Sequence, residues 1–528
     1  MIKETKYPKW LDDAVFYEIY PQSFFDTNGD GIGDFEGIIQ KLQYVKDLGC
    51  NALWINPCFD SPFSDAGYDV RDYKKTAARY GTNDDLKRLF AKAHELGIRV
   101  FLDLVPGHTS EEHPWFTESS AAHPQNYRNR YIWTDHCFTR AEGLGFIGGE
   151  KERAAVYITN FYKCQPALNF GFLNPTETWQ LPADHPDCIV TKEAIKDVMR
   201  YWMDMGCDGF RVDMAFSLVK HDDEKRSGTS AIWREIRAML DKEYPEAAVV
   251  SEWSNPVQAI NAGFHIDFLL AFRKGSGYQS LLRDYELDEY NMPQGQDNSF
   301  FRKGGKNNIT RFLDDYLFHY ENTKDLGFIS LVTGNHDLAR IGYTLNRAEL
   351  ALAYAFIFTM PGIPFLYYGD EIGMRYLNLP TKEGGYYRTG ARSPMQWKAG
   401  PNLGFSTAPA DKLYLPVDSA ADAPNVEAQE KDESSLLNTV KALLRLRHAE
   451  PDLQSKANLE IIYAEKDALP FIYKRGSLVL AVNPGGSAAS APAPSVNEAK
   501  NIYAIGGCSL EGGLCRMQAQ SFGIWRIL

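Results

Sequence analysis

The sequence predicts an α/β fold: a (β/α)8 TIM barrel with an inserted subdomain after the third strand and a C-terminal β-sandwich. Three observations lead to this expectation. Short apolar runs rich in β-branched or aromatic residues alternate with helical patterns over most of the chain. One connection between such runs is much longer than a barrel loop. The C-terminal residues lose the helical period and alternate in the manner of strands.

Eight apolar runs are the candidate barrel strands. They lie at 15–20, 52–55, 100–105, 209–212, 248–251, 266–270, 328–333 and 365–367. Between the second and third runs, residues 83–97 place Leu86, Leu89, Phe90 and Ala93 on one helical face. Another helix is predicted at 192–205. Strands that alternate with helices are typical of parallel βαβ units, and eight such units form a closed barrel.

The predicted organisation has four segments. Residues 1–108 and 183–450 form the two parts of the barrel, and 109–182 form the inserted subdomain because this stretch has no clear strand–helix unit. A helix at 433–450 carries an apolar stripe that closes the barrel. Residues 451–528 form the β-sandwich. Two Ala/Pro/Ser-rich stretches, 419–429 and 484–500, are expected to be surface loops.

Composition and charge exclude several classes of protein. The 44% hydrophobic and 24% charged residues are ordinary for a globular protein, and no apolar run is long enough to span a bilayer. A net charge of −13 disfavours nucleic acids and anionic membranes as partners. The eight cysteines form no CxxC pair and the chain starts without a secretory signal, which predicts reduced thiols and a cytoplasmic location. A cloned mature form of a secreted or periplasmic protein would look the same. We expect a monomer or a small homo-oligomer.

Polar side chains follow four of the predicted strands, at the rim where barrels of this kind hold their sites. The third strand ends with Asp103 and is followed by His108, and the fourth ends with Arg211 and is followed by Asp213. Glu252 follows the fifth strand, and His336 and Asp337 follow the seventh.

Three of these carboxyls suit acid–base chemistry. Arg211 and Asp213 are two residues apart on a strand, so their side chains point the same way, and the guanidinium should lower the pKa of the carboxylate. Glu252, beside Trp253, would be held as the protonated acid by an apolar wall. A retaining glycosidase needs such a pair roughly 5–5.5 Å apart. Asp337 would hold sugar hydroxyls and favour ring distortion.

The same residues allow two other interpretations. An Asp after a strand often caps the next helix, and a His at the rim can satisfy a backbone carbonyl. Alternatively, Asp103, His108, His336 and Asp337 could bind a divalent ion in a metal-dependent hydrolase, and spacing alone leaves this open.

Nine stretches in this order resemble the α-amylase superfamily, glycoside hydrolase family 13. They are DAVFYEIYPQSF, GYDVRDY, DLVPGH, QPALNF, GFRVD, SEW, TGNHD, GIPFLYYGDEIGM and ARSPMQW. The resemblance implies that Asp213 is the nucleophile, Glu252 the general acid/base and Asp337 the transition-state stabiliser, with no catalytic cofactor. It also implies a glycone subsite lined by Tyr68, Asp69, His108, Arg211 and His336.

The segment YYRTGARSPMQW resembles the branch of the family that acts on oligosaccharides: α-glucosidases, oligo-1,6-glucosidases, trehalose synthases and sucrose isomerases. By this resemblance Asp69 and Arg388, with Arg392 as a second candidate, bind the glucose at the non-reducing end. The substrate is then an oligosaccharide or α-glucoside, cleaved through a covalent glycosyl-enzyme intermediate. An α-glucosyl isomerase or transferase, and a catalytically silent carbohydrate-binding homologue, are the alternatives.

Three residues depart from the family's pattern. Gly107 stands where the family usually has an Asn that binds calcium between barrel and insertion, and Ala167 stands where many relatives have Asp. Met214 follows the predicted nucleophile, where relatives carry Val, Ala or Thr according to linkage. Linkage preference and that calcium site therefore stay open.

An acidic loop, DTNGDGIGDFEG at 26–37, follows the first strand. The calcium-loop template is matched in order by Asp26, Asn28, Asp30, the carbonyl of Ile32, and Asp34. Gly37 stands where an EF-hand needs a bidentate Glu, so spacing alone leaves open a metal site or a solvated turn. The resemblance implies a structural Ca²⁺ here, with Mg²⁺ as the alternative ion.

Overall fold

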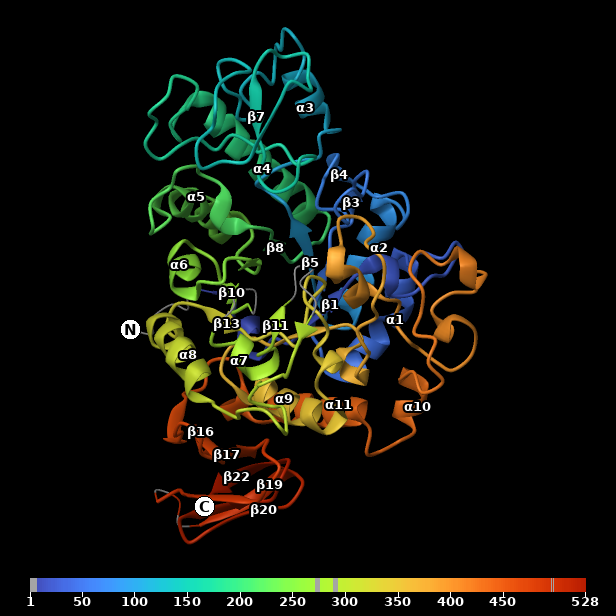
Figure 1. Ribbon diagram of the computed structural model, residues 1–528, viewed down its shortest axis with the longest axis vertical. Coiled ribbons are helices and arrows are strands. Elements are labelled where there is room, and N and C mark those ends of the chain that lie inside the picture. The colour runs from blue at the N-terminus through green and yellow to red at the C-terminus, as the bar shows by residue number, and fades with distance from the viewer. Residues whose placement is uncertain (1–6, 271–275, 288–292, 495, 497) are drawn as a thin grey trace.

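An eight-stranded parallel sheet forms the centre of the computed structural model, which describes residues 7–270, 276–287, 293–494, 496 and 498–528 (Figure 1). In sheet order the strands are β13 (Phe328–Ser330), β10 (Ile266–Phe268), β9 (Ala248–Ser251), β8 (Gly209–Val212), β5 (Arg99–Leu104), β2 (Ala52–Ile55), β1 (Phe16–Ile19) and β14 (Phe365–Tyr367). A parallel bridge between Val332 and Phe365 joins the two outer strands, so the barrel is nearly closed. All eight predicted strands are confirmed.

Helices cover the outside of the barrel. They are α1 (Phe35–Leu48), α2 (Asn83–Glu95), α4 (Pro186–Asp204), α5 (Ser227–Glu243), α6 (Pro256–Asn261), α7 (Gln279–Leu282), α8 (Thr310–Thr323), α9 (Arg347–Thr359), α10 (Val426–Glu430) and α11 (Leu436–Ala449). The stripe predicted on α2 is buried, and Thr82 and Asp85 form a capping box at its start. The helix predicted at 192–205 begins earlier, at Pro186, because His185 caps it and proline fits the first turn.

The insertion lies between β5 and α4, at one end of the molecule. It contains α3 (Pro114–Ser119) and a hairpin of β6 (Phe146–Gly148) and β7 (Val156–Ile158). Six buried residues give it a small core of its own: Ile132, Ala141, Ile158, Ala167, Phe172 and Trp179. The inserted subdomain is thus confirmed, whereas the limits at residues 108, 182 and 450 remain predictions.

Two further short antiparallel strand pairs lie outside the barrel sheet. β3 (Phe59–Asp60) pairs with β4 (Asp72–Thr76), and β11 (Glu286–Leu287) pairs with β12 (Pro293–Gln294). Among the described residues, no helix is long and apolar enough to cross a membrane.

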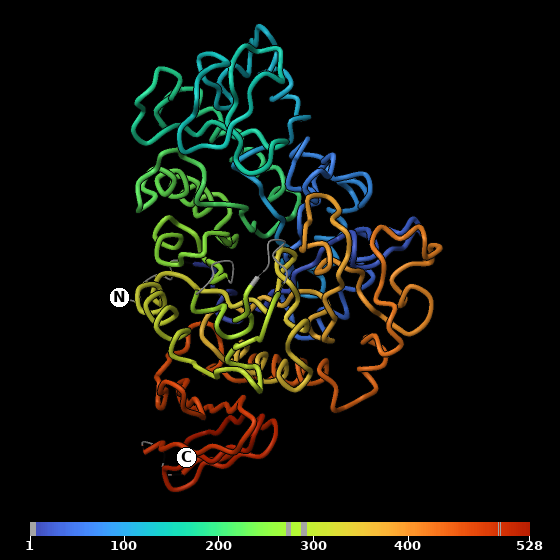
Figure 2. The backbone as a smooth tube through the Cα atoms, in the orientation of Figure 1, coloured from blue at the N-terminus to red at the C-terminus, as the bar shows by residue number. Residues whose placement is uncertain are grey.

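Two antiparallel sheets form the C-terminal end, opposite the insertion along the long axis of the molecule (Figure 2). The first contains β15 (Glu460–Tyr463), β16 (Phe471–Arg475), β17 (Leu478–Asn483), β22 (Ser521–Ile527) and β19 (Ala499–Ile505), and the second β18 (Ala489–Pro492), β21 (Leu514–Met517) and β20 (Cys508–Glu511). Both stretches expected to be loops therefore contain regular structure: α10 begins within 419–429, and β18 lies within 484–500. β18 pairs with β21, and its Ala491 side chain is buried in the core between the two sheets.

Candidate active site

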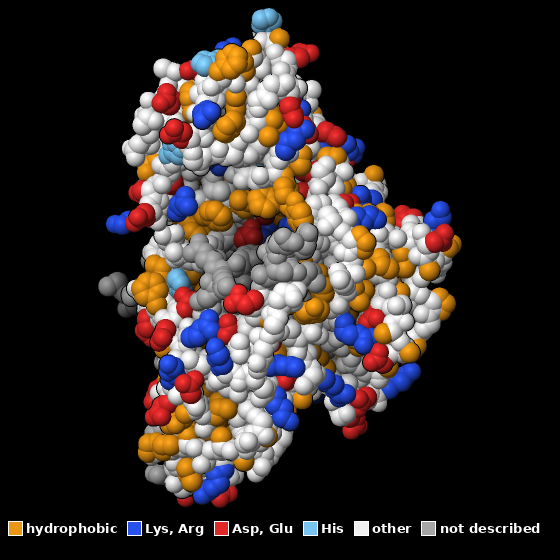
Figure 3. Space-filling view, in the orientation of Figure 1, with side chains coloured by type: hydrophobic (Ala, Val, Ile, Leu, Met, Phe, Trp, Pro, Cys, Tyr) orange, Lys and Arg blue, Asp and Glu red, His pale blue; other side chains and the backbone are white. Residues whose placement is uncertain are grey.

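The C-terminal ends of the barrel strands open on a cavity of about 260 Å³. Its polar lining residues are Asp65, Tyr68, His108, Asp213, Glu252, Ser254, Asp337 and Arg388, and its apolar ones are Phe161, Met214, Phe216, Trp253 and Leu270. Figure 3 shows hydrophobic side chains along the edge of a hollow that faces the insertion. The cavity thus combines carboxyls with aromatic rings, which is the usual lining of a site for a neutral, ring-shaped ligand.

One guanidinium holds the two central carboxyls in place. Arg211 on β8 is 2% exposed, and its Nη1 lies 3.1 Å from Asp213 Oδ1 while its Nη2 lies 3.0 Å from Glu252 Oε2. The spacing of two residues on β8 puts Arg211 and Asp213 on the same face, as predicted. Glu252 follows the neighbouring strand β9, which pairs in register with β8. The predicted nucleophile and acid therefore share one cation.

The residue after Asp213 also positions Glu252. Met214 has φ 40° and ψ 44°, a left-handed conformation that is unfavourable for a side chain of this size. In this conformation its backbone N–H donates to Glu252 Oε2 at 2.9 Å. The strained backbone conformation of Met214 thus directs its N–H toward Glu252, the predicted acid.

The pKa of Asp213 differs from the sequence-based expectation. Burial raises it first and the charge of Glu252 raises it further, while Arg211 lowers it, and the net result lies well above the ordinary value. Arg211 therefore acts in the predicted direction but is outweighed.

Asp337, which follows β13, has the opposite electrostatic environment. Its Oδ1 accepts from Arg388 Nη1 at 3.0 Å and from Arg392 Nη2 at 3.1 Å, and its Oδ2 lies 3.4 Å from His336 Nε2. Burial raises the pKa of Asp337, but the contacts with His336, Arg388 and Arg392 lower it more, so the pKa falls well below its ordinary value. Asp337 is therefore ionised across the neutral range.

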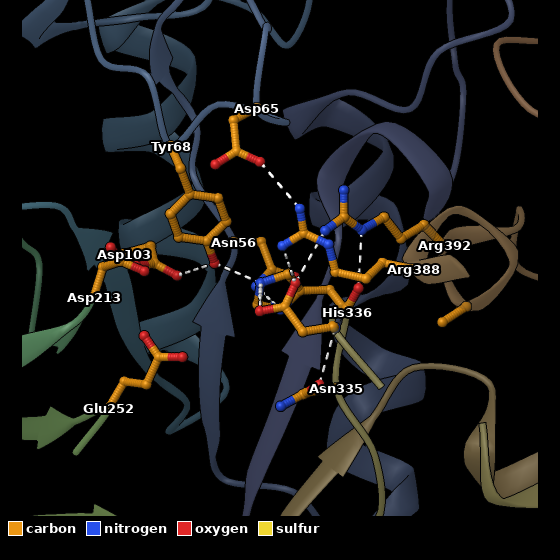
Figure 4. A network of polar contacts seen from close by, with 12 residues as sticks. Asn56, Asp65, Tyr68, Asp103, Asp213, Glu252, Asn335, His336, Arg388 and Arg392 are labelled. Carbon is orange, nitrogen blue, oxygen red and sulfur yellow. Dashed lines mark hydrogen bonds and ion pairs between the residues drawn. The ribbon is translucent and has the colours of Figure 1, made fainter. Parts of the chain in front are cut away.

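The structure does not bring Asp69 to the cavity. Asp69 is 0% exposed, and its carboxylate accepts from Ser61 Oγ at 3.0 Å, Ser64 N at 2.8 Å and Asp65 N at 3.0 Å. Asp65, which was not predicted, lines the cavity instead, and its Oδ1 lies 3.3 Å from Arg388 Nη2 (Figure 4). The two aspartates flank the tyrosine in DAGYD, so spacing alone gave no reason to prefer one of them.

The other predicted substrate residues do gather at the cavity wall. Tyr68 Oη donates to Asp103 Oδ2 at 3.0 Å and contacts His336 Nε2 at 2.6 Å (Figure 4). His108 Nε2 lies 3.2 Å from the backbone oxygen of Tyr68, and burial lowers the pKa of His108 to about 3, so its imidazole is neutral. Arg211 and His336 are buried behind Tyr68 and do not line the cavity themselves. They contact Tyr68 and the carboxyls that do.

The described residues contain no cluster of metal-ligating side chains that would fit the metal-hydrolase interpretation. Over the described part of the chain, no three His, Cys, Asp or Glu side chains gather as a metal ion requires. Asp103, one of the four predicted ligands, is held by Arg211, Tyr68 and Trp54 instead.

The acidic loop after β1 forms consecutive turns. Asp26 Oδ1 accepts from the backbone of Asn28 at 3.1 Å, Asn28 Oδ1 accepts from Asp30 at 2.9 Å, and Asp30 Oδ1 accepts from Ile32 at 2.9 Å. Asp34 accepts from Gly37 N and is the N-cap of α1. Asp34 therefore has a structural task in the helix, whether or not it also binds a metal.

Comparisons with known proteins agree with the site. The family described as "Alpha amylase, catalytic domain" matches residues 18–456. The trehalose synthase/amylase TreS of Mycobacterium tuberculosis is 32% identical over 516 residues, which cover 90% of this chain and 82% of that protein. An oligo-1,6-glucosidase of Heyndrickxia coagulans is 31% identical over 533 residues, covering 88% and 90%.

Among solved structures, a variant of the trehalulose synthase MutB has the same fold. Its TM-score is 0.81 at 24% identity, over 98% of this chain and 100% of that chain. The strand-end residues, the barrel and these relatives lead to one conclusion: the chain belongs to the α-amylase family of glycoside hydrolases.

Proposed function

We propose that the protein cleaves α-glucosidic bonds of maltooligosaccharides or related α-glucosides with retention of configuration, and that it releases glucose from the non-reducing end. The observation that carries the proposal is the placement of Asp213 and Glu252 on the two arms of Arg211, beside a cavity walled by the Asp65–Arg388 ion pair.

The chemistry follows from the two carboxyls. Asp213 attacks the anomeric carbon and forms a covalent glycosyl-enzyme, while Glu252 gives a proton to the departing oxygen. Glu252 then takes a proton from the incoming water, which attacks the same carbon and releases Asp213. Asp337, ionised beside Arg388 and Arg392, accepts hydrogen bonds from the sugar hydroxyls and stabilises the positive charge that develops on the ring.

The raised pKa of Asp213 is compatible with this division of tasks. Part of the rise comes from the charge of Glu252, and that part disappears when the proton sits on Glu252. Arg211 then stabilises the remaining charge on Asp213, which is the form that attacks.

The small volume of the cavity supports action at a chain end. Pockets for drug-sized ligands are roughly 300–1,000 Å³, and this cavity, at about 260 Å³, suits a single sugar ring. A substrate panel of maltose, maltotriose, isomaltose, sucrose, trehalose and starch tests the proposal. We expect turnover of the short substrates; activity on starch but not on maltose would refute action at the chain end.

An α-glucosyl isomerase is the second candidate, favoured by the names of the relatives. Trehalose synthases from Mycobacterium tuberculosis and from Pimelobacter are 32% and 31% identical to this chain. The same three carboxyls serve both reactions, which differ in whether water or the released sugar takes the glucosyl group. Incubation with maltose decides between them, since a hydrolase yields glucose and an isomerase yields trehalose.

A structural Ca²⁺ in the 26–34 loop is a further part of the proposal, with Mg²⁺ as the alternative ion. The proposal rests on the sequence spacing of Asp26, Asn28, Asp30, the carbonyl of Ile32 and Asp34, which offer the oxygen ligands that such ions prefer. The three aspartates, all among the described residues, do not gather as a metal ion requires in the structure, so ion binding would rearrange their turn contacts. Melting curves with EDTA and with each cation test it. If neither cation changed the melting temperature, the loop would be a turn without a bound ion.

We also propose a cytoplasmic location and a monomer or small homo-oligomer. The cysteines of the described residues are free, and most of them are buried, which suits a reducing compartment. Cell fractionation and light scattering are the corresponding measurements.

A further inference from the structure

A buried carboxyl that the proposed chemistry does not use lies behind His336. Glu18 on β1 is 0% exposed, and its Oε1 lies 2.8 Å from His336 Nδ1. On the other side of the imidazole, Nε2 lies 2.6 Å from Tyr68 Oη and 3.4 Å from Asp337 Oδ2. The imidazole therefore connects Glu18 with two residues that line the cavity.

The single hydroxyl hydrogen of Tyr68 sets the direction of this chain. Burial raises the pKa of Asp103 to about 6 against the charge of Arg211, so Asp103 is ionised at pH 7 and above. An ionised carboxylate only accepts hydrogen bonds, and Tyr68 Oη lies 3.0 Å from Asp103 Oδ2, so Tyr68 donates its hydrogen there. The contact between Tyr68 Oη and His336 Nε2 then needs its hydrogen on Nε2.

The charge of Asp337 favours the same arrangement. Arg388 and Arg392 keep this carboxylate ionised, and its Oδ2 faces His336 Nε2 at 3.4 Å. A hydrogen on Nε2 is attracted by the carboxylate, whereas a lone pair there would be repelled. Both neighbours of Nε2 thus require a donor.

One hydrogen remains to be placed, between Glu18 and Nδ1. A separation of 2.8 Å is a hydrogen bond, so one hydrogen lies between these two atoms. Either Glu18 is ionised beside an imidazolium, or a neutral Glu18 donates to a neutral imidazole. The two forms have the same net charge and differ only in the position of that hydrogen.

Burial favours the neutral form. Asn56 Nδ2 lies 3.1 Å from Glu18 Oε1 and 3.0 Å from His336 Nδ1, and an N–H donor beside Nδ1 favours a bare Nδ1. Glu18 Oε2 has no hydrogen-bond partner among the described residues, so an ionised Glu18 would keep one oxygen unsolvated. Burial raises the pKa of Glu18 well above its ordinary value. Burial also lowers the pKa of His336; Asp337 opposes this, and Arg392, Arg211 and Arg388 add to it.

We propose that Glu18 is a positioning residue that stays protonated, donates through Oε1 to His336 Nδ1, and thereby fixes His336 as a neutral imidazole with its hydrogen on Nε2. In this form His336 is a fixed neutral donor that holds Tyr68 and Asp337 at the cavity wall, and it adds no positive charge near the developing oxocarbenium ion. The catalytic benefit rests on the proposed function, whereas the positions of the hydrogens do not.

Nitrogen-15 NMR of histidine-labelled protein at pH 7, without substrate, tests the proton positions. The His336 signals are assigned by their loss in His336→Gln. We expect a bare, pyridine-type Nδ1 and a protonated Nε2. Two protonated nitrogens would show an imidazolium beside an ionised Glu18, and a protonated Nδ1 with a bare Nε2 would show the other tautomer; either result overturns the proposal.

Two substitutions separate the donor from mere packing. Glu18→Gln offers an N–H where the neutral acid offers O–H, so the variant should keep the Nε2 tautomer and a kcat within a few-fold of the wild type. Glu18→Leu removes the donor, and kcat should fall about tenfold to a hundredfold with a smaller change in KM. Thermal melting shows whether each variant is folded.

The wild-type spectrum and Glu18→Gln remain decisive if Glu18→Leu does not fold. Loss of the tautomer in folded Glu18→Gln would contradict the proposal. A first product of inverted configuration would refute the proposed function and leave the NMR result standing, so the two failures can be told apart.

Discussion

The two ends of the cavity are built differently. At one end Asp213 and Glu252 come from adjacent, paired strands and share Arg211 from the same strand as Asp213. At the other end Asp337 is held by Arg388 and Arg392, and Arg388 in turn by Asp65, a residue more than three hundred positions away in the chain. The strand end carries a carboxyl whose pKa is raised, and the loop end one whose pKa is lowered. One barrel rim thus provides two electrostatic environments, one around the proposed catalytic carboxyls and one around the proposed ligand of the sugar hydroxyls.

The largest effect is expected at the strand end. Asp213→Asn removes the proposed nucleophile and should lower kcat roughly 10⁴-fold or more. Glu252→Gln, which removes the proposed acid, should have an effect of similar size on substrates with poor leaving groups. Steady-state and single-turnover rates on maltose measure this. Near-normal turnover in a folded variant of either kind would move the chemistry to other residues.

The loop end should respond through substrate binding. Asp65→Asn breaks the ion pair with Arg388, which is mostly shielded from solvent, and kcat/KM on maltose should fall about tenfold to a thousandfold. Asp69→Asn is the matched control, since that carboxylate supports the turn at Ser61–Asp65 without reaching the cavity. It should lower stability more than kcat/KM. The reverse order of effects would restore Asp69 as the sugar ligand.

A buried lysine beside the strand end should make stability depend on pH. Lys220 Nζ donates to Asn160 Oδ1 at 2.7 Å, and burial lowers its pKa to about 7. In the unfolded chain the lysine has a pKa of about 10.4 and binds this proton more tightly. The free energy of unfolding therefore rises as pH increases from about 7 to 10. Lys220→Met should flatten this part of the profile, measured by urea unfolding. An unchanged slope would show that Lys220 stays charged in the folded state.

The smallest effect on catalysis is expected in the acidic loop after β1, which does not line the cavity. Asp30→Ala removes one proposed ion ligand and the turn contact to Ile32, so the melting temperature in Ca²⁺ should fall while kcat of the folded enzyme stays within a few-fold. Differential scanning calorimetry with and without EDTA measures it. A large loss of kcat at unchanged melting temperature would tie the loop to the chemistry.

Residues next to strands could be predicted because a strand fixes where its side chains point. Side chains along a strand alternate with a period of two residues, so Arg211 and Asp213 point the same way. Glu252 lies beside them because the neighbouring barrel strands are parallel. The choice between Asp65 and Asp69 depended on the turn between them, which spacing does not encode. Glu18 gave no signal at all, because a glutamate in an apolar run shows neither its burial nor its partner in the sequence. The strand at Ala489–Pro492 was missed because its small residues have weak strand propensity and become buried only against β21.

The configuration of the first product tests the central claim most directly. Proton NMR of a freshly mixed reaction with an aryl α-glucoside, which releases a single glucose per bond cleaved, distinguishes the anomers of that glucose before mutarotation mixes them. If Asp213 forms a covalent intermediate that water then cleaves, the glucose released from the non-reducing end appears first as the α-anomer. If that glucose appears first as the β-anomer, the two carboxyls act by a single displacement, and the proposed covalent intermediate on Asp213 is contradicted.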